Sequence, residues 1–250
     1  MRNSAGPGET VASRIIGILE CFDGFHRTAT LTQIAERSGL TMPTAHRLVK
    51  ELAEAGLLRR GQGGAYSLGM KMWELGCAAP DITRLQEGAM PYLQDLYEAT
   101  RENVHFAIRD GHETIYVVKL SGPTSISLTT RVGRRLNWHT TGVGKAIVAF
   151  SDEEVQEEML SVPLERLTPT TIVDPEKMRL EFARIRESGF ALSQGEHETG
   201  TFSLAAPVLD RSRQPVAAVA VTLPSSRANV AQLNAAVRTV AIGITRTLVG

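Results

Sequence analysis

The hydrophobic pattern near the N-terminus predicts three short helices. Apolar residues recur at the spacing of one helical face from Val11 to Phe22, and Asp23 with Gly24 ends that segment. The stretch from Thr30 to Gln33 has the form of a capping box, and the helix that it opens ends at Gly39. A third helix runs from Thr41 to Gly56. Because only a tight turn around Gly39 separates the last two helices, the pattern is that of a helix-turn-helix.

The third helix has two chemically different faces. With about 100° of rotation per residue, the apolar face collects Ala45, Leu48, Val49 and Leu52. The residues that we expect at the DNA come from the helix start and the opposite face: Thr41, Pro43, Thr44, His46, Arg47 and Lys50. Such a helix can enter the major groove. A purely structural amphipathic helix has the same apolar stripe, so the prediction depends on the turn-separated pair of helices.

A glycine-rich hairpin follows the third helix. Two short strand-like segments, from Leu57 to Arg60 and from Ala65 to Leu68, flank the loop Gly61 to Gly64. Its arginines, Arg59 and Arg60, can reach phosphate or the minor groove, as in a DNA-binding wing. A phosphate-binding loop of an enzyme would instead follow a strand and open a helix.

The rest of the chain alternates between strand and helix patterns. A short helix from Leu68 to Gly76 ends before Pro80, which suggests a linker. The segments expected beyond it are a helix at 82–100, strands at 104–109, 114–120 and 125–130, helices at 142–150, 152–160 and 175–188, strands at 202–209 and 216–223, and a helix from Asn229. Strands at both ends with helices between them predict an α+β domain, an antiparallel sheet flanked by helices.

Composition narrows the class of protein. The chain has 250 residues, 42% of them hydrophobic, and 27 basic residues balance 27 acidic ones, so no global field attracts nucleic acid or membrane. The segment from Arg37 to Lys71, however, contains six basic residues and only two acidic ones. No apolar run reaches the roughly 20 residues of a membrane helix, and Met1 to Glu9 lacks the layout of a secretory signal. We therefore expect a cytoplasmic protein without a membrane partner, and its two cysteines are too few for a disulfide framework.

One glycine-rich segment of the second domain partly resembles a nucleotide-binding loop, but two of its residues do not fit that motif. Gly142 to Lys145 resembles part of a phosphate loop, but His139 stands at the place of its first glycine and Ala146 replaces the magnesium-binding hydroxyl. The helix that begins here can still hold an anionic ligand with its free amides, helped by Thr140 and Thr141. An ordinary capped helix is the alternative.

Residue patterns for catalysis are missing from the sequence. It has no nucleophile elbow, and its six histidines lack the spacing of a zinc protease. Glu196, His197 and Glu198 can supply metal ligands in principle, although three adjacent side chains point in different directions, and a solvated loop is the simpler interpretation. We predict no enzyme activity, no cofactor and no metal.

The order of these segments resembles the IclR family of transcriptional regulators. The matching stretches cover nearly the whole chain and are 31–40 (LTQIAERSGL), 43–48 (PTAHRL), 66–69 (YSLG), 139–146 (HTTGVGKA) and 198–208 (ETGTFSLAAPV). The resemblance implies three parts: a winged helix-turn-helix at 1–68, a linker helix at 69–82 used in dimerisation, and an effector-binding domain of GAF/PAS type at 83–250. It also implies a homodimer, with a tetramer left open.

The resemblance further implies where a small-molecule effector binds. The contacts transferred from the family are Thr141, Gly142 and Val143 at the helix start, and Ala220, Val221 and Thr222 on a strand. Ser193 stands where many members have an acidic residue, and Ser203 where many have cysteine. Because a carboxylate and a thiol are absent from these positions, a small keto acid is a doubtful ligand, whereas the hydroxyls can still donate to an acid.

The sequence thus predicts a regulator that binds a double-stranded DNA operator under the control of an organic or aromatic acid. A constitutive DNA-binding protein whose second domain only oligomerises is one alternative. An enzyme or adaptor that uses the winged domain for protein interactions is another.

Overall fold

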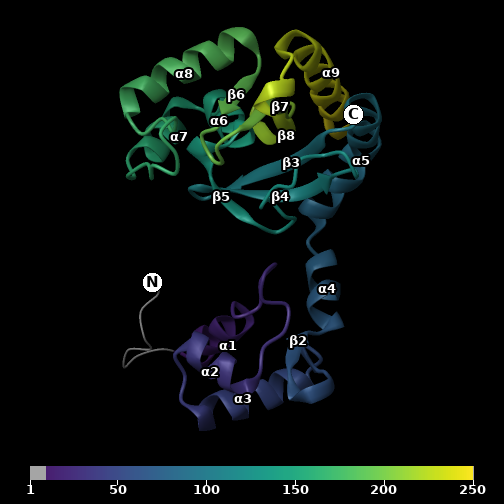
Figure 1. The fold of residues 1–250 in the computed structure, drawn as a ribbon, viewed down its shortest axis with the longest axis vertical. Coiled ribbons are helices and arrows are strands. Elements are labelled where there is room, and N and C mark those ends of the chain that lie inside the picture. The colour runs from purple at the N-terminus through teal and green to yellow at the C-terminus, as the bar shows by residue number, and fades with distance from the viewer. Residues whose placement is uncertain (1–9, 250) are drawn as a thin grey trace. The chain divides into compact units, whose positions relative to one another are not determined.

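The computed structural model describes residues 10–249, so the segment Met1 to Glu9, from which no secretory signal was inferred, lies outside the described residues. The chain divides into two compact units between Thr83 and Arg84 (Figure 1). No described helix is long and apolar enough to cross a lipid bilayer. Each unit is described by itself below.

The first unit is a winged helix-turn-helix. Its elements are α1 (Val11–Leu19), α2 (Leu31–Ser38), α3 (Met42–Glu54), β1 (Leu58–Arg60), β2 (Tyr66–Leu68) and α4 (Met70–Cys77). The strands β1 and β2 pair antiparallel, with Arg59 opposite Ser67, and a one-turn 3₁₀ segment at Gln62–Gly64 joins them. The predicted helices and hairpin are present, although α1 ends three residues earlier than its apolar pattern.

Local capping fixes the helix-turn-helix. The Thr30 hydroxyl accepts from the Gln33 amide at 3.3 Å, and the Gln33 side chain accepts from the Thr30 amide at 2.9 Å, so the predicted capping box is confirmed. Gly39 ends α2 in the left-handed conformation, with φ of 68°. Helix α3 begins one residue after the predicted start at Thr41, and the Thr41 hydroxyl contacts the Thr44 hydroxyl at 3.0 Å rather than a backbone amide.

The second unit is built on one six-stranded sheet. Its elements are α5 (Pro80–Thr100, which starts in the first unit), β3 (Asn103–Asp110), β4 (Glu113–Leu120), β5 (Arg135–Asn137), α6 (Gly142–Phe150), α7 (Glu153–Leu160), α8 (Pro175–Ser188), β6 (Ala191–Gln194), β7 (Thr201–Leu209), β8 (Pro215–Pro224) and α9 (Val230–Val249). The strand order is β5-β4-β3-β8-β7-β6, and every neighbouring pair is antiparallel. The predicted α+β class with a helix-flanked antiparallel sheet is confirmed.

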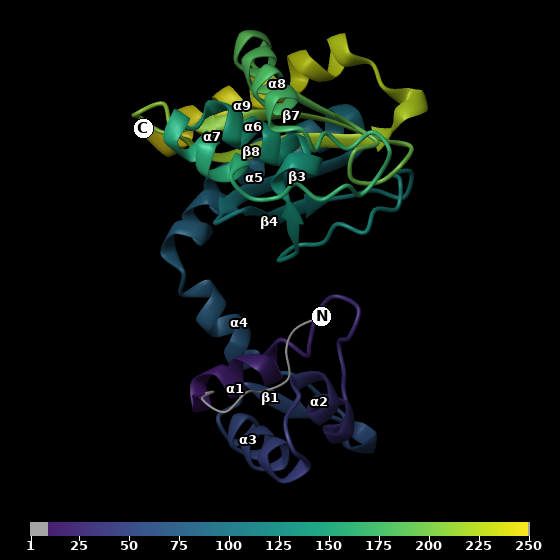
Figure 2. The same ribbon diagram turned by 90° about the vertical axis from the view of Figure 1, so that its left-hand side faces the viewer.

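Helices cover both faces of this sheet. Helices α6, α7 and α8 lie over one face, and α5 and α9 lie over the other, as the two views of the ribbon show (Figures 1 and 2). Eight of the nine residues of α6 are buried, which is the pattern of a helix enclosed on all sides. Trp138, Ile147, Phe182 and Ala218 belong to the core between α6, α8 and the sheet.

The expected set of strands differs from the structure at three places. The strand expected at 125–130 is absent, and this stretch is irregular, although Leu128 and Thr130 are less exposed than the residues on either side of them. Two backbone carbonyls of this stretch accept hydrogen bonds from side chains and not from a neighbouring strand. Asn103 Nδ2 donates to the Ile126 carbonyl at 2.9 Å, and Lys119 Nζ donates to the Thr130 carbonyl at 2.8 Å. The short edge strands β5 and β6 were not predicted.

Gly144 allows α6 to pack against the turn before it, and this contact can be tested. A Cβ at Gly144 would lie 2.2 Å from the Trp138 carbonyl oxygen, which neither backbone can accommodate without moving. We expect Gly144→Ala to lower the free energy of unfolding by about 1–3 kcal/mol. Gly17→Ala is the control, because a Cβ on α1 meets nothing within 4 Å there, and a gain of about 0.5–1 kcal/mol is expected. Urea unfolding of both variants measures the difference, and equal effects would contradict the prediction.

Candidate functional site

Helix α3 presents a polar surface on the first unit. Ala45, Leu48, Val49 and Leu52 are buried against the rest of that unit. The predicted DNA-contacting residues lie on the other side of the helix or in the hairpin, and all are exposed except the partly buried Thr44: Thr41, Pro43, His46, Arg47, Lys50, Arg59 and Arg60. The exposed residues of α3 therefore form one face, with two further arginines supplied by β1.

Acidic residues accompany the cations of α3. Arg47 Nη1 lies 2.8 Å from Glu51 Oε1, and Lys50 Nζ lies 3.7 Å from Glu54 Oε1, each pair one helical turn apart. All four side chains are more than half exposed, so water weakens the attraction and each pair contributes little to stability. Both cations can therefore leave their carboxylates for a phosphate or a base edge at small cost.

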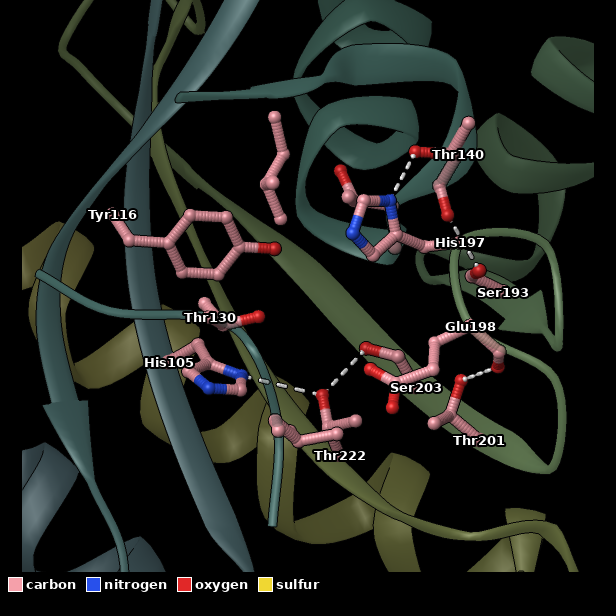
Figure 3. Close-up of a pocket in the computed structure, with 14 residues that line it drawn as sticks. His105, Tyr116, Thr130, Thr140, Ser193, His197, Glu198, Thr201, Ser203 and Thr222 are labelled. Atoms are coloured by element: carbon pink, nitrogen blue, oxygen red, sulfur yellow. Dashed lines mark hydrogen bonds between the residues drawn. The ribbon is translucent and has the colours of Figure 1, made fainter. Parts of the chain in front are cut away.

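A polar pocket opens in the second unit between the sheet and the start of α6 (Figure 3). It holds about 390 Å³ of empty space, including the part open to solvent. Its lining residues come from β3, β4, β5, β6, β7, β8, the start of α6 and two loops: His105, Tyr116, Leu128, Thr130, Leu136, Thr140, Thr141, Gly142, Ser193, His197, Glu198, Thr201, Ser203 and Thr222. Most of these side chains carry a hydroxyl, an imidazole or a carboxyl group.

The start of α6 supplies backbone donors to this pocket. The Thr141 hydroxyl accepts from the Gly144 amide at 3.1 Å, and the Thr141 carbonyl accepts from the Lys145 amide at 3.0 Å. The amides of Gly142 and Val143, in the first turn, have no acceptor within the helix. Gly142 can approach β7 closely, since a Cβ there would lie 3.1 Å from Ser203 Oγ. An anion at this point would meet both amides and the positive end of the helix dipole.

A chain of hydrogen bonds crosses the floor of the pocket from β3 to β7. Thr222 Oγ1 donates to Ser203 Oγ at 3.1 Å, and His105 Nδ1 lies 3.3 Å from Thr222 Oγ1 (Figure 3). Because the Thr222 hydrogen is already committed to Ser203, Nδ1 must be the donor to Thr222. The Ser203 hydroxyl then accepts from Thr222 and keeps its own hydrogen for a ligand.

The loop before β7 closes another side of the pocket. His197 Nδ1 lies 3.1 Å from Thr140 Oγ1, which donates to the Asn137 carbonyl at 2.9 Å, so Nδ1 is again the donor. Ser193 Oγ donates to the Thr140 carbonyl at 2.8 Å. These bonds connect the start of α6 to β6 and to the loop that carries His197 (Figure 3).

Burial keeps the pocket histidines neutral. Desolvation, together with a smaller effect of the positive charge of Lys119, lowers the pKa of His105 to about 3. Desolvation also lowers the pKa of His197, with the nearby charge of Arg134 adding to the effect. For Tyr116, burial raises the phenol pKa far above its usual range. At neutral pH the pocket therefore offers neutral donors and acceptors, with Glu198 at its rim.

Five of the eight residues expected at the effector line this pocket: Thr141, Gly142, Ser193, Ser203 and Thr222. The other three, Val143, Ala220 and Val221, are almost fully buried and do not line it. Val143 and Ala220 belong to the core beside α6. Strand alternation turns Val221 to the face opposite Thr222.

Several lining residues were not predicted, above all His105 and Tyr116 on β3 and β4. Their positions alternate inward on the strands, but this alternation is shared with ordinary core residues. The expectation of a solvated loop at Glu196 to Glu198 is wrong: Glu196 is 6% exposed and lies 2.7 Å from Lys145 Nζ. Within residues 10–249 no three His, Cys, Asp or Glu side chains group in a way that could hold a metal ion.

A winged helix-turn-helix followed by a domain with a polar pocket defines a class, the ligand-responsive DNA-binding regulators. Two family models match the chain: the IclR helix-turn-helix domain over residues 11–62 and the bacterial transcriptional regulator IclR C-terminal domain over residues 77–246. The chain belongs to the IclR family of transcriptional regulators, which is a family of regulators and not of enzymes.

Curated and structural relatives agree with this assignment. The chain is 32% identical over 77% of its length to the regulator KipR of Bacillus subtilis, covering 77% of that protein, and 31% identical over 88% to XynR of Escherichia coli, covering 88%. An IclR homologue from Microbacterium hydrocarbonoxydans, solved in complex with 4-hydroxybenzoate, superposes with a TM-score of 0.90 at 30% identity, over 96% of this chain and 99% of that one. The structure of IclR from Thermotoga maritima superposes with a TM-score of 0.78 at 28% identity, over 95% of this chain and 96% of that one.

The buried neutral His105 makes stability depend on pH. Its pKa is about 3 in the folded chain and about 6.5 when unfolded, so between these values only the unfolded chain binds the proton, and stability falls as the pH falls. His105→Gln should remove up to about 1.4 kcal/mol per pH unit from this dependence between pH 6 and pH 4. Urea unfolding across that range measures it. His112→Gln, at an exposed histidine, is the control, and an unchanged dependence in His105→Gln would contradict the prediction.

Proposed function

We propose that the chain recognises its operator through α3 and the β1–β2 hairpin, and that an organic acid bound in the pocket changes this recognition. The observation that carries the proposal is the exposed polar face of α3 in a winged helix-turn-helix. Bacterial chromosomes lie in the cytoplasm, so this function agrees with the compartment expected from the sequence.

The DNA contacts divide into two kinds. Thr44, His46 and Arg47 occupy the N-terminal part of α3, which in this motif faces the base edges. Lys50 lies further along the same face, where it would neutralise a phosphate, and Arg59 with Arg60 would do so from the wing. Thr41 and Pro43 would approach the backbone at the helix start.

For the ligand we propose a small organic acid, aliphatic or aromatic, that binds through its carboxylate. The carboxylate would take the free amides of Gly142 and Val143 and the free hydrogen of Ser203. Tyr116 and Leu136 offer surfaces for an apolar body opposite these donors. The 4-hydroxybenzoate in the Microbacterium hydrocarbonoxydans homologue supports this class of ligand.

We further propose a homodimer that forms through α4 and the wing, with a tetramer left open. Several apolar side chains in this region are exposed, at 42% for Leu68, 69% for Met70, 68% for Trp73 and 54% for Leu75. A second copy would remove this apolar surface from water. The dimer would also read two half-sites, because a single winged domain buries little surface on DNA.

The operator prediction is tested by footprinting on the DNA that flanks the gene, in excess competitor DNA. A dimer should protect two symmetric half-sites about 10 base pairs or a multiple of it apart. Lys50→Ala should weaken binding to all sequences and reduce the salt dependence by about one unit. Arg47→Ala should cost about 1–3 kcal/mol at one base pair if it contacts a base edge.

Lys177→Ala, an exposed lysine on α8, is the control for loss of a positive charge and should bind the operator as the wild type does. An unchanged footprint and salt dependence in both α3 variants would exclude α3 as the recognition helix.

The ligand prediction is tested by thermal denaturation with a panel of carboxylates that includes 4-hydroxybenzoate. A member that binds should raise the melting temperature and change operator affinity. Ser203→Ala should weaken its binding by about five- to tenfold, because one donor is lost. Ser212→Ala, in an exposed turn, should bind like the wild type. A panel without any stabilising member would favour the constitutive alternative, in which the second unit only oligomerises.

A further inference from the structure

A buried ion pair lies behind the pocket. Lys145, one turn into α6, is fully buried, and its Nζ lies 2.7 Å from Glu196 Oε1 and 3.4 Å from Glu181 Oε1. Glu181 belongs to α8 and is partly exposed, whereas Glu196 is almost completely buried. The second carboxylate oxygen of Glu196 has no hydrogen-bond partner within the described part of the chain. Neither the DNA face nor the pocket lining uses this pair.

Glu196 belongs to the turn that carries two lining residues into the pocket. This turn, residues 195–200, joins β6 to β7, and His197 and Glu198 follow Glu196 directly. Thr171 Oγ1 donates to the Glu196 carbonyl and Thr168 Oγ1 to the Gly195 carbonyl, both at 2.7 Å. The side chain of Glu196 thus points to α6 on the dry side while its neighbours form the pocket wall.

We propose that Lys145 and Glu196 are positioning residues of the effector pocket, which hold the 195–200 turn at a fixed place against the start of α6. This inference rests on the proposed function of the pocket. The same short stretch of α6 that carries Lys145 also begins with the free amides of Gly142 and Val143. The ion pair therefore sets the distance between the amides and the wall that carries His197 and Glu198.

Stability alone does not account for such a pair. Desolvation of two charges cancels much of their attraction, and two apolar side chains of similar volume often serve a core equally well. An apolar pair, however, makes no directional bond that would fix the position of residue 196 in the turn. The contact of His197 with Thr140 is the only other side-chain bond described between the turn and the segment that precedes α6. Without the ion pair, that bond is the side-chain bond that remains between the turn and this segment, while Thr168 and Thr171 still bind the backbone of the turn.

Hydrogen exchange of the ligand-free chain tests the proposal. The amides of Gly195 and Thr201 report on the turn, since they donate to the Thr201 and Glu198 carbonyls at 2.8 and 3.2 Å. In Lys145→Met/Glu196→Met both charges are gone and the volume is nearly kept, so global stability should stay close to that of the wild type. We expect the two turn amides to exchange about tenfold faster while the amides of β3 and β8 keep their protection.

Two further variants sharpen the result. Glu196→Gln keeps the shape of the side chain and removes only its charge, and it should accelerate the same amides. Glu181→Gln is the matched control: it also removes a carboxylate from Lys145, but it lies on α8, and the turn should keep its protection. Wild-type protection of the turn in the double variant would overturn the proposal. So would failure of both Glu196 variants to fold, which would make the pair a structural element of the core.

A ligand measurement adds a second outcome. For any carboxylate that binds the wild type, the double variant should need at least about tenfold more ligand for half-saturation, with operator affinity in its absence unchanged. An equal ligand affinity would overturn the proposal. If no carboxylate binds the wild type, the ligand part of the proposed function fails, and the exchange result still decides the role of the ion pair.

Discussion

The second unit depends on one constraint, the enclosure of α6 against the middle of the sheet. Eight of its nine residues are buried, and Gly142 and Gly144 allow close backbone contact with β7 and with Trp138. A helix enclosed in this way has a fixed axis, so its first turn always points to the same place. The pocket lies at that place. The first-turn amides of Gly142 and Val143 are therefore presented by a helix that is buried along almost its whole length.

Much of the fold could be predicted from local sequence. The capping box at Thr30, the glycine stop at Gly39 and the apolar stripe of α3 are local signals, and each specifies its structure without help from distant residues. Helices α6 and α8 were predicted with the boundaries that they have. The segment 125–130 was misassigned because its alternation is real, while the partners of its backbone are the side chains of Asn103 and Lys119, which no local pattern shows.

The site was less predictable than the fold, for a physical reason. The serine and threonine residues of the pocket were predicted through resemblance to a family. The same prediction included Val143, Ala220 and Val221, which are their neighbours in sequence and do not line the pocket. Ala220 and Thr222 lie on the same face of β8, but Ala220 packs in the core beside α6 and Thr222 lines the pocket at the start of that helix. The contacts of Lys145 with Glu196 and Glu181 join residues 51 and 36 positions apart and have no local signal.

The paired charges on α3 have a consequence for how the protein searches a genome. Arg47 and Lys50 each carry their own counter-charge on the next turn, and the whole chain has no net charge. Affinity for arbitrary DNA comes mainly from release of cations that surround the phosphates. In the proposed complex with DNA, each carboxylate beside α3 would repel those phosphates and oppose part of that gain. Dwell times on unrelated sequence would then be shortened, and occupancy would concentrate on sites where base contacts compensate for the repulsion.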